Sequence, residues 1–273
     1  MSNPLWRTND AFSGRSSYTT TVGGGRAVRS PGLENNASGL DGSYGLQAYP
    51  ARQTDAMTHD DVIVRTFGLL ALLVFTGVAT WMFAPVLMFV GFPVAFVLGI
   101  IAGRRVAPGP GLCIAFTIFE GMGIGGLSGF FETAYKGIIL QAVVATIAVF
   151  ATVLVLYSFG VIRTSARATR FVVTATIGYM VFCVLNFGLV WFGVLPDFGI
   201  RSVTVFGVPL GLVISIVAVL LASYHLMRDF DYVQMGVAAR APRRLAWMCS
   251  LCLLATLVWL YLEFLRIFAL LRN

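Results

Sequence analysis

Charge is scarce in this sequence. Of its 273 residues, 11% are charged and 58% are hydrophobic, whereas an ordinary soluble domain is about 25% charged and about 45–50% apolar. A soluble protein with so few charges could not cover its surface with polar groups. The scarcity excludes a soluble globular enzyme, a nucleic-acid-binding module and a disordered protein, and it predicts an integral membrane protein.

Lysine and cysteine are also rare, and each absence excludes a class of protein. The one lysine, Lys136, lies far from the last apolar run, so no lysine is there to form the Schiff base of a retinal protein. The four cysteines all lie inside apolar runs, which excludes a disulfide framework. Cys249 and Cys252 have the spacing of half a zinc or redox site, but small packing residues of a membrane helix explain them better.

The first 58 residues have a different composition from the rest. They are rich in Gly, Ser, Thr, Asn and Arg and show neither helical nor strand periodicity, so residues 1–58 are expected to be a disordered cytoplasmic tail. The segment lacks a basic stretch followed by an apolar core, and it is therefore not expected to be a cleaved signal peptide.

Long uncharged runs fill residues 59–273. Thr66–Gly103 is uncharged throughout and far too long for one crossing of a ~30 Å bilayer core, and Ala84-Pro85 divides it into a helical hairpin. Strands of a membrane β-barrel would be about ten residues long and would alternate in polarity, which these runs do not. The runs predict an all-α bundle of seven transmembrane helices, at about 66–83, 85–103, 111–131, 137–160, 171–195, 205–231 and 246–271.

The distribution of basic residues predicts the orientation. With the N-terminus inside, the inside segments hold fifteen arginines, and three basic residues (Lys136, Arg201 and Arg272) remain outside. The positive-inside rule therefore places the N-terminus in the cytoplasm and the C-terminus outside the cytoplasmic membrane.

Charged side chains at membrane depth are candidate functional residues, because they are costly unless paired or hydrated. Glu120 is the one acid of the run 111–131. In the last run, polar side chains recur every three or four residues and share one face of a helix: Cys249, Cys252, Thr256, Trp259, Glu263 and Arg266. Glu263 and Arg266 are three residues apart and can pair. They either shape a pathway or form a structural ion pair.

A second polar cluster stands at the end of the sixth run: His225, Arg228, Asp229 and Asp231. Asp231 is expected on the same membrane side as Arg104 and Arg105, where a carboxylate–guanidinium contact would act as a latch. Burial favours the neutral form of a carboxylic acid and a nearby arginine favours the charged form, so a site balanced between the two responds to protons. Alternatively, Asp229 and Asp231 are the solvated end of a helix.

Two motifs in the third run have a simpler explanation. Gly121 and Gly125 belong to a G-x-G-x-x-G pattern, but no strand precedes it, and spacing of four is typical of small residues where helices pack closely. Gly126-Leu127-Ser128-Gly129 matches the G-x-S-G of rhomboid intramembrane proteases, with His225 on a later helix as the base. Charged residues follow this histidine where a rhomboid has close-packing glycines, so a serine protease is a remote alternative and no enzymatic activity is predicted.

Several segments together resemble the Bax inhibitor-1-like membrane proteins, in particular their bacterial branch. The segments that carry the resemblance are Met57–Val62, Phe119–Ser128, Gly137-Ile138 with Gln141, Ala142 and Thr146, Asp229-Phe230-Asp231, and Thr256–Arg266. The resemblance implies a bundle with the seventh helix at its centre and a pH-sensitive leak of calcium ions. It also implies that the acids on helices six and seven, here Asp231 and Glu263, sense protons, and that Arg104 or Arg105 latches the closed form.

Glu263 departs from the family pattern, which has an aspartate about two helical turns earlier, where Thr256 stands here. Whether Asp231 and Glu263 touch therefore stays open at this point. We expect Glu263 and Glu120 to line or shape the pathway, Arg266 to pair with Glu263, and His225 and Asp229 to be secondary candidates.

The sequence therefore predicts a proton-modulated leak of calcium or other cations in the lipid bilayer. Calcium binding would be weak, and neither a cofactor nor a tightly bound metal is expected. The alternative is a non-conducting scaffold that binds other membrane proteins or a membrane protease. Nucleic acid is not an expected partner.

Overall fold

The computed structural model describes residues 56–159, 164–193, 204–205 and 208–272. Its elements in chain order are α1 (His59–Phe83), the 3₁₀-helix η4 (Pro85–Leu87), α2 (Met88–Gly103), α3 (Pro110–Ala134), α4 (Ile138–Ser158), α5 (Ala166–Trp191), the strands β1 (Thr204–Val205) and β2 (Val208–Pro209), α6 (Leu210–Ala238) and α7 (Leu245–Arg272). Within these residues, seven helices are long and apolar enough to cross a membrane, as the sequence predicts.

The helix ends follow from local chemistry. Thr58 caps α1 by a capping box, in which its hydroxyl accepts from the Asp61 amide and the Asp61 carboxylate accepts from the Thr58 amide. Pro85 follows the last residue of α1 by two positions and opens η4, which separates the two arms of the predicted hairpin. Pro110 stands in the first turn of α3, where its missing N–H costs nothing.

Several helix boundaries differ from the sequence expectation, most of all in α1 and α6. α1 begins at His59 rather than near residue 66, because the capping box favours a helix start there. The charged residues Asp60, Asp61 and Arg65 therefore lie in the first two turns of α1. α6 begins at Leu210, after the β1–β2 pair, and continues to Ala238, seven residues past its expected end.

The predicted disordered tail, residues 1–58, lies outside the described residues up to position 55, and its last three residues belong to the fold. Ala56 forms a β-bridge with Pro242. The Met57 amide donates to the Ala241 carbonyl (2.8 Å), and the Met57 side chain is 2% exposed. This segment therefore joins the start of α1 to the connection between α6 and α7.

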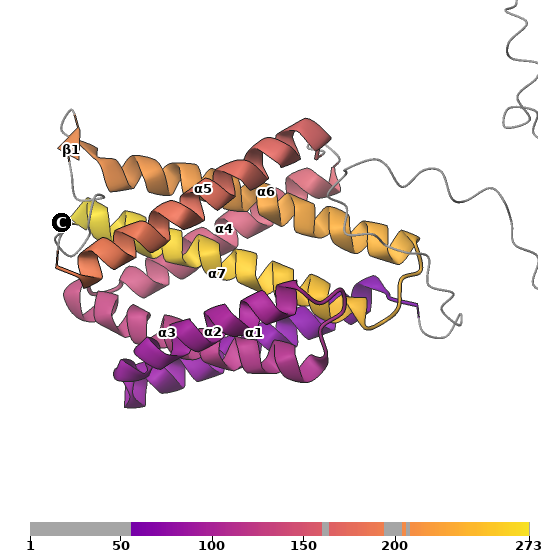
Figure 1. Ribbon diagram of the computed structural model, residues 1–273, viewed down its shortest axis with the longest axis horizontal. Helices are drawn as coiled ribbons and strands as arrows, with labels where there is room; N and C mark the ends of the chain where they lie inside the picture. Colours follow the sequence, from indigo (N-terminus) through magenta and orange to yellow (C-terminus); the bar gives the residue numbers. More distant parts are fainter. Residues whose placement is uncertain (1–55, 160–163, 194–203, 206–207, 273) are drawn as a thin grey trace, which may run out of the picture. The chain divides into compact units, whose positions relative to one another are not determined.

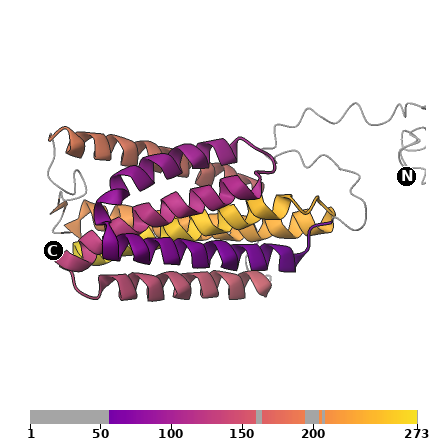
Figure 2. The ribbon, with the colours of Figure 1, turned by 90° about the horizontal axis from the view of Figure 1, so that it is seen from below.

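α7 is the central helix of the bundle (Figure 1; Figure 2). It packs against α1, α3, α4 and α6, and its Leu254, Leu260 and Ala269 are fully buried. α5 lies on the α6 side, away from α1, α2 and α3 (Figure 1). α7 therefore lies between the group of α1, α2 and α3 on one side and the pair of α5 and α6 on the other.

Glycines bring α3 close to α1 and α2. A Cβ atom on Gly121 would lie 2.7 Å from the Leu73 carbonyl oxygen, and one on Gly125 would lie 2.7 Å from the Gly77 Cα. On the other face, a Cβ atom on Gly91 would lie 2.8 Å from the Phe119 carbonyl oxygen. These are backbone-to-backbone approaches that only glycine permits, and they are what small residues spaced by four achieve between membrane helices.

Candidate functional site

Polar side chains of α5, α6 and α7 meet along one line inside the bundle, and we call this line the polar seam. Its members are Thr176 and Tyr179 of α5, His225, Arg228 and Asp229 of α6, and Thr256, Trp259, Glu263 and Arg266 of α7. The α7 members are four of the six residues whose spacing predicts a polar face.

Glu263 has the most buried carboxylate of the seam, with a residue exposure of 1%. Its Oε1 accepts from Arg266 (2.6 Å) and from the Tyr179 hydroxyl, and Arg266 also donates to that hydroxyl (3.0 Å). The i,i+3 spacing thus forms the ion pair that it allows. The Oε2 atom is buried and has no hydrogen-bond partner among the described residues. A buried acceptor without a hydrogen bond is costly.

Trp259 divides the seam into two halves. Its ring stacks on Tyr179 (centroids 5.7 Å apart, 18° between planes) and contacts His225 (5.7 Å, 48°). The indole Nε1 is buried and, like Glu263 Oε2, has no partner in the part of the chain that is described. The tryptophan thus stands between the Tyr179–Glu263–Arg266 group and the histidine.

His225 and Asp229, the secondary candidates, are members of the seam. Thr176 lies 2.9 Å from His225 Nε2, and Arg228 lies 3.3 Å from His225 Nδ1. The Thr256 hydroxyl donates to Asp229 (2.7 Å). Of the two acids of α6, Asp229 and Asp231, Asp229 therefore faces α7. Its partner there is Thr256, a member of the predicted polar face of α7.

Asp231 faces away from the seam, toward α4. Its carboxylate accepts from the Tyr157 hydroxyl (2.7 Å) and from the Thr164 hydroxyl, which precedes α5. Two residues along a helix correspond to a turn of about 200°, so Asp229 and Asp231 point to nearly opposite sides. The structure consequently brings Asp231 to neither Glu263 nor Arg266.

The expected contact between Asp231 and Arg104 or Arg105 is not formed, so this part of the prediction is corrected. Both arginines are exposed at the end of α2. Within the described residues, the ion pairs are Arg65–Asp61, Arg243–Asp61 and Arg266–Glu263. The sequence could place Asp231 and the arginines at one end of the bundle, but it could not show that α4, rather than α2, covers that face of α6.

Glu120 lies at a different interface, between α3 and α7. It shares a face of α3 with Thr117 and Ile124, and Ile124 packs with Leu254 and Val258 of α7. The Glu120 carboxylate forms no hydrogen bond or ion pair with another described residue. Glu120 and Glu263 therefore belong to opposite sides of α7 and do not form one acidic site.

The geometry does not support the remote protease alternative. The Ser128 hydroxyl lies 2.8 Å from the Tyr261 hydroxyl on α7, and the two ring nitrogens of His225 are engaged by Thr176 and Arg228. The serine and the histidine thus have different partners and form no dyad.

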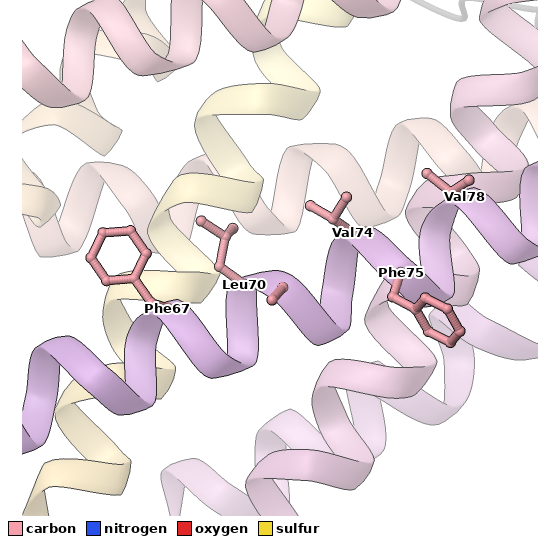
Figure 3. Close-up of a pocket in the computed structure, with 6 residues that line it drawn as sticks. Phe67, Leu70, Val74, Phe75 and Val78 are labelled. Atoms are coloured by element: carbon pink, nitrogen blue, oxygen red, sulfur yellow. The ribbon is translucent and has the colours of Figure 1, made fainter.

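No three His, Cys, Asp or Glu side chains converge as metal ligands among the described residues. Two hollows on the surface are lined almost wholly by apolar side chains. One follows a single face of α1, where Phe67, Leu70 and Val74 project (Figure 3). In a membrane these hollows would face lipid, so the polar seam is the candidate functional site.

Sequence reasoning missed the contribution of α5, and of Tyr157 and Thr164, to this chemistry. The signal for α5 was present, since Thr176 and Tyr179 are three residues apart and share a helical face. Their hydroxyls were overlooked because neither is charged.

A family model described as Bax inhibitor 1 like matches residues 3–273, which is nearly the whole chain. No curated protein matches the sequence.

Proposed function

Since the chain belongs to the Bax inhibitor 1-like family, and is therefore a multi-pass integral membrane protein, we propose that it is a proton-modulated leak for calcium or other cations. The observation that carries the proposal is the polar seam. It places two carboxylates, two arginines and a histidine inside a bundle of predominantly apolar helices. Such groups are rare at membrane depth and typically mark ion and proton pathways.

The oxygen atoms of the seam suit a hard cation. Asp229, Thr256 and Glu263 offer carboxylate and hydroxyl oxygens along the same face of the α6–α7 contact, and calcium prefers such ligands. The contacting Asp229 and Thr256, with Glu263 about two helical turns further along α7, would bind the ion weakly, as a leak requires. Glu120 would shape the opposite side of α7.

Asp231 is the proposed proton sensor, acting through partners other than the arginines. As a carboxylate it accepts from both Tyr157 and Thr164, and so ties α6 to α4 and to the segment before α5. Protonation removes an acceptor position and weakens these two hydrogen bonds, so the C-terminal part of α6 can move away from α4. The leak is then expected to increase as the pH on that side falls.

The proposed location is the cytoplasmic membrane, with the N-terminus in the cytoplasm and the C-terminus outside. The distribution of arginines supports this orientation. Asp231 lies in the half of α6 that leads to the α6–α7 connection, seven residues before the last residue of the helix, and would then sense cytoplasmic pH.

Reconstitution tests the proposal. Purified protein in liposomes loaded with a calcium indicator should admit calcium at a rate that rises at acid pH. Asp231→Asn, which cannot ionise, should keep the flux high at every pH, and Asp60→Asn at the exposed start of α1 should behave like wild type. An Asp231→Asn variant with the full pH response would refute Asp231 as the sensor. Folded wild-type protein without flux at any pH would refute the leak.

A non-conducting scaffold for other membrane proteins is the second candidate. The direct Glu263–Arg266 pair favours it, because paired charges also serve simply to hold helices together. Replacing Asp231 and Glu263 together separates the two functions. A leak loses its pH-dependent flux, whereas a scaffold loses stability or partner binding.

A further inference from the structure

The two arginines of the polar seam have different surroundings. Arg266 donates to the Glu263 carboxylate at 2.6 Å, so its charge is cancelled at contact. No carboxylate oxygen of a described residue lies within 4.0 Å of an Arg228 side-chain nitrogen, so Arg228 forms no ion pair with these residues. The side-chain hydrogen bond that Arg228 forms is to a ring nitrogen, His225 Nδ1, at 3.3 Å.

The contact with Arg228 defines the state of the histidine. A guanidinium has only donors, so His225 Nδ1 must be the acceptor and the ring must be neutral. Nε2 then carries the hydrogen and donates to the Thr176 hydroxyl at 2.9 Å. The partner of Arg228 is therefore uncharged, and it does not offset the positive charge.

Asp229 is the nearest acid in sequence, but its carboxylate is held by α7. Its Oδ2 accepts from the Thr256 hydroxyl at 2.7 Å. Arg228 stands ten residues before the last residue of α6, about 15 Å along the helix axis. An incompletely balanced positive charge thus lies well inside the helix, where its field is screened less than at the surface.

We infer that Arg228 is the residue that excludes cations from the polar seam in the state described by the structure. The inference rests on the proposed function and deepens it, because it names the residue that sets the resistance of the pathway to cations. A cation that moves along the seam from Asp229 toward Glu263 must pass the Arg228 charge. This role differs from the carboxylate sensor, since it depends on a fixed charge.

Neutral replacement of Arg228 tests the inference. Arg228→Gln and Arg228→Met should each raise calcium and potassium flux into liposomes by about tenfold or more, and should shift the cation-to-chloride permeability ratio toward cations. Arg228→Lys retains the charge and should keep both values near wild type. Arg167→Gln is the matched control, because it removes an exposed arginine of α5 outside the seam.

The readouts distinguish selectivity from structure. A merely structural role would lower the thermal stability of Gln, Met and Lys variants alike without moving the permeability ratio, which would overturn the inference. Wild-type flux with an unchanged ratio in Arg228→Gln and Arg228→Met would also overturn it and leave the leak intact. A silent wild type with conducting neutral variants would support the inference and refute the proposed leak of the wild-type protein. Silence in wild type and in both neutral variants, all folded, would overturn the inference and the proposed function together.

Discussion

Helices α3 and α5 have nearly equal lengths, 25 and 26 residues, but they meet their neighbours by different chemistry. α3 has ten buried residues, five of them glycines, which place its backbone against α1 and α2. Among the α5 side chains that are described, only Val172 is buried. α5 is held instead by hydrogen bonds from Thr169, Thr176 and Tyr179 to α6 and α7.

The difference indicates which part of the bundle can respond to protons and ions. Apolar helices gain little from leaving lipid for one another, so close van der Waals packing and interhelical hydrogen bonds hold them together. Glycine contacts are insensitive to charge. Two of these three hydrogen bonds of α5 end on a histidine and a carboxylate, so a change of charge in the polar seam would loosen α5 and leave α3 in place.

The largest effect should come from filling the glycine interface. In Gly125→Leu the new side chain meets the backbone of Gly77, which cannot move aside as a side chain would, and we expect a loss of more than about 3 kcal/mol. The variant should elute as aggregate in detergent gel filtration. Gly178→Leu on α5, where a Cβ atom meets nothing within 4 Å, should elute like wild type. Equal behaviour of the two variants would remove the contrast between the helices.

Breaking the buried ion pair should come second. Glu263→Ala leaves Arg266 without its partner, and we expect a loss of about 3 kcal/mol, since the Glu263 side chain is 2% and that of Arg266 29% exposed. Unfolding in mixed detergent–SDS micelles measures the loss. Removing both residues should cost less than the sum of the single changes. An additive double variant would show that the pair is not coupled.

Removing one α5 hydroxyl should have a smaller effect. Tyr179→Phe keeps the stacking on Trp259 but removes a donor to Glu263 and an acceptor for Arg266, for an expected loss of about 1–3 kcal/mol. Faster proteolysis on the α5 side of the bundle, in the same micelles, would indicate that α5 has loosened. Tyr135→Phe, at the end of α3, is the control and should unfold like wild type.

The smallest effect should come from a polar contact outside the seam. Arg243 pairs with Asp61 at 2.7 Å, but its side chain is 60% exposed, and such pairs contribute about 1 kcal/mol or less. Arg243→Gln should therefore unfold close to wild type in the same micelle assay. A loss as large as that of Glu263→Ala would mean that the end of the bundle, rather than the seam, determines stability.

The sequence was sufficient to predict the helices because each is an apolar run of membrane length. It also placed Thr256, Trp259, Glu263 and Arg266 on one face of α7, because residues three or four apart lie on the same face of any α-helix. It could not assign Asp231 to α4, because the identity of the neighbouring helix depends on packing between segments about 70 residues apart.

The start of α1 was missed for a related reason. Asp60 and Asp61 precede the uncharged run from which the first helix was predicted, whereas the capping box and the pairing of Asp61 with Arg243 make them part of a helix end. Polar character at a membrane boundary is compatible with both structures, so composition alone could not decide between them.

The central position of α7 has a consequence for biosynthesis. α7 leaves the ribosome after all six helices that it organises, and the Ser250 hydroxyl then donates to the Val62 carbonyl, 188 residues earlier in the chain. Until that moment α1, α2 and α3 can associate through their glycines, whereas α6 has no partner for Asp229. A chain arrested before α7 would thus be a half-assembled membrane protein with an exposed acid, the kind of intermediate that insertion chaperones hold and membrane proteases remove.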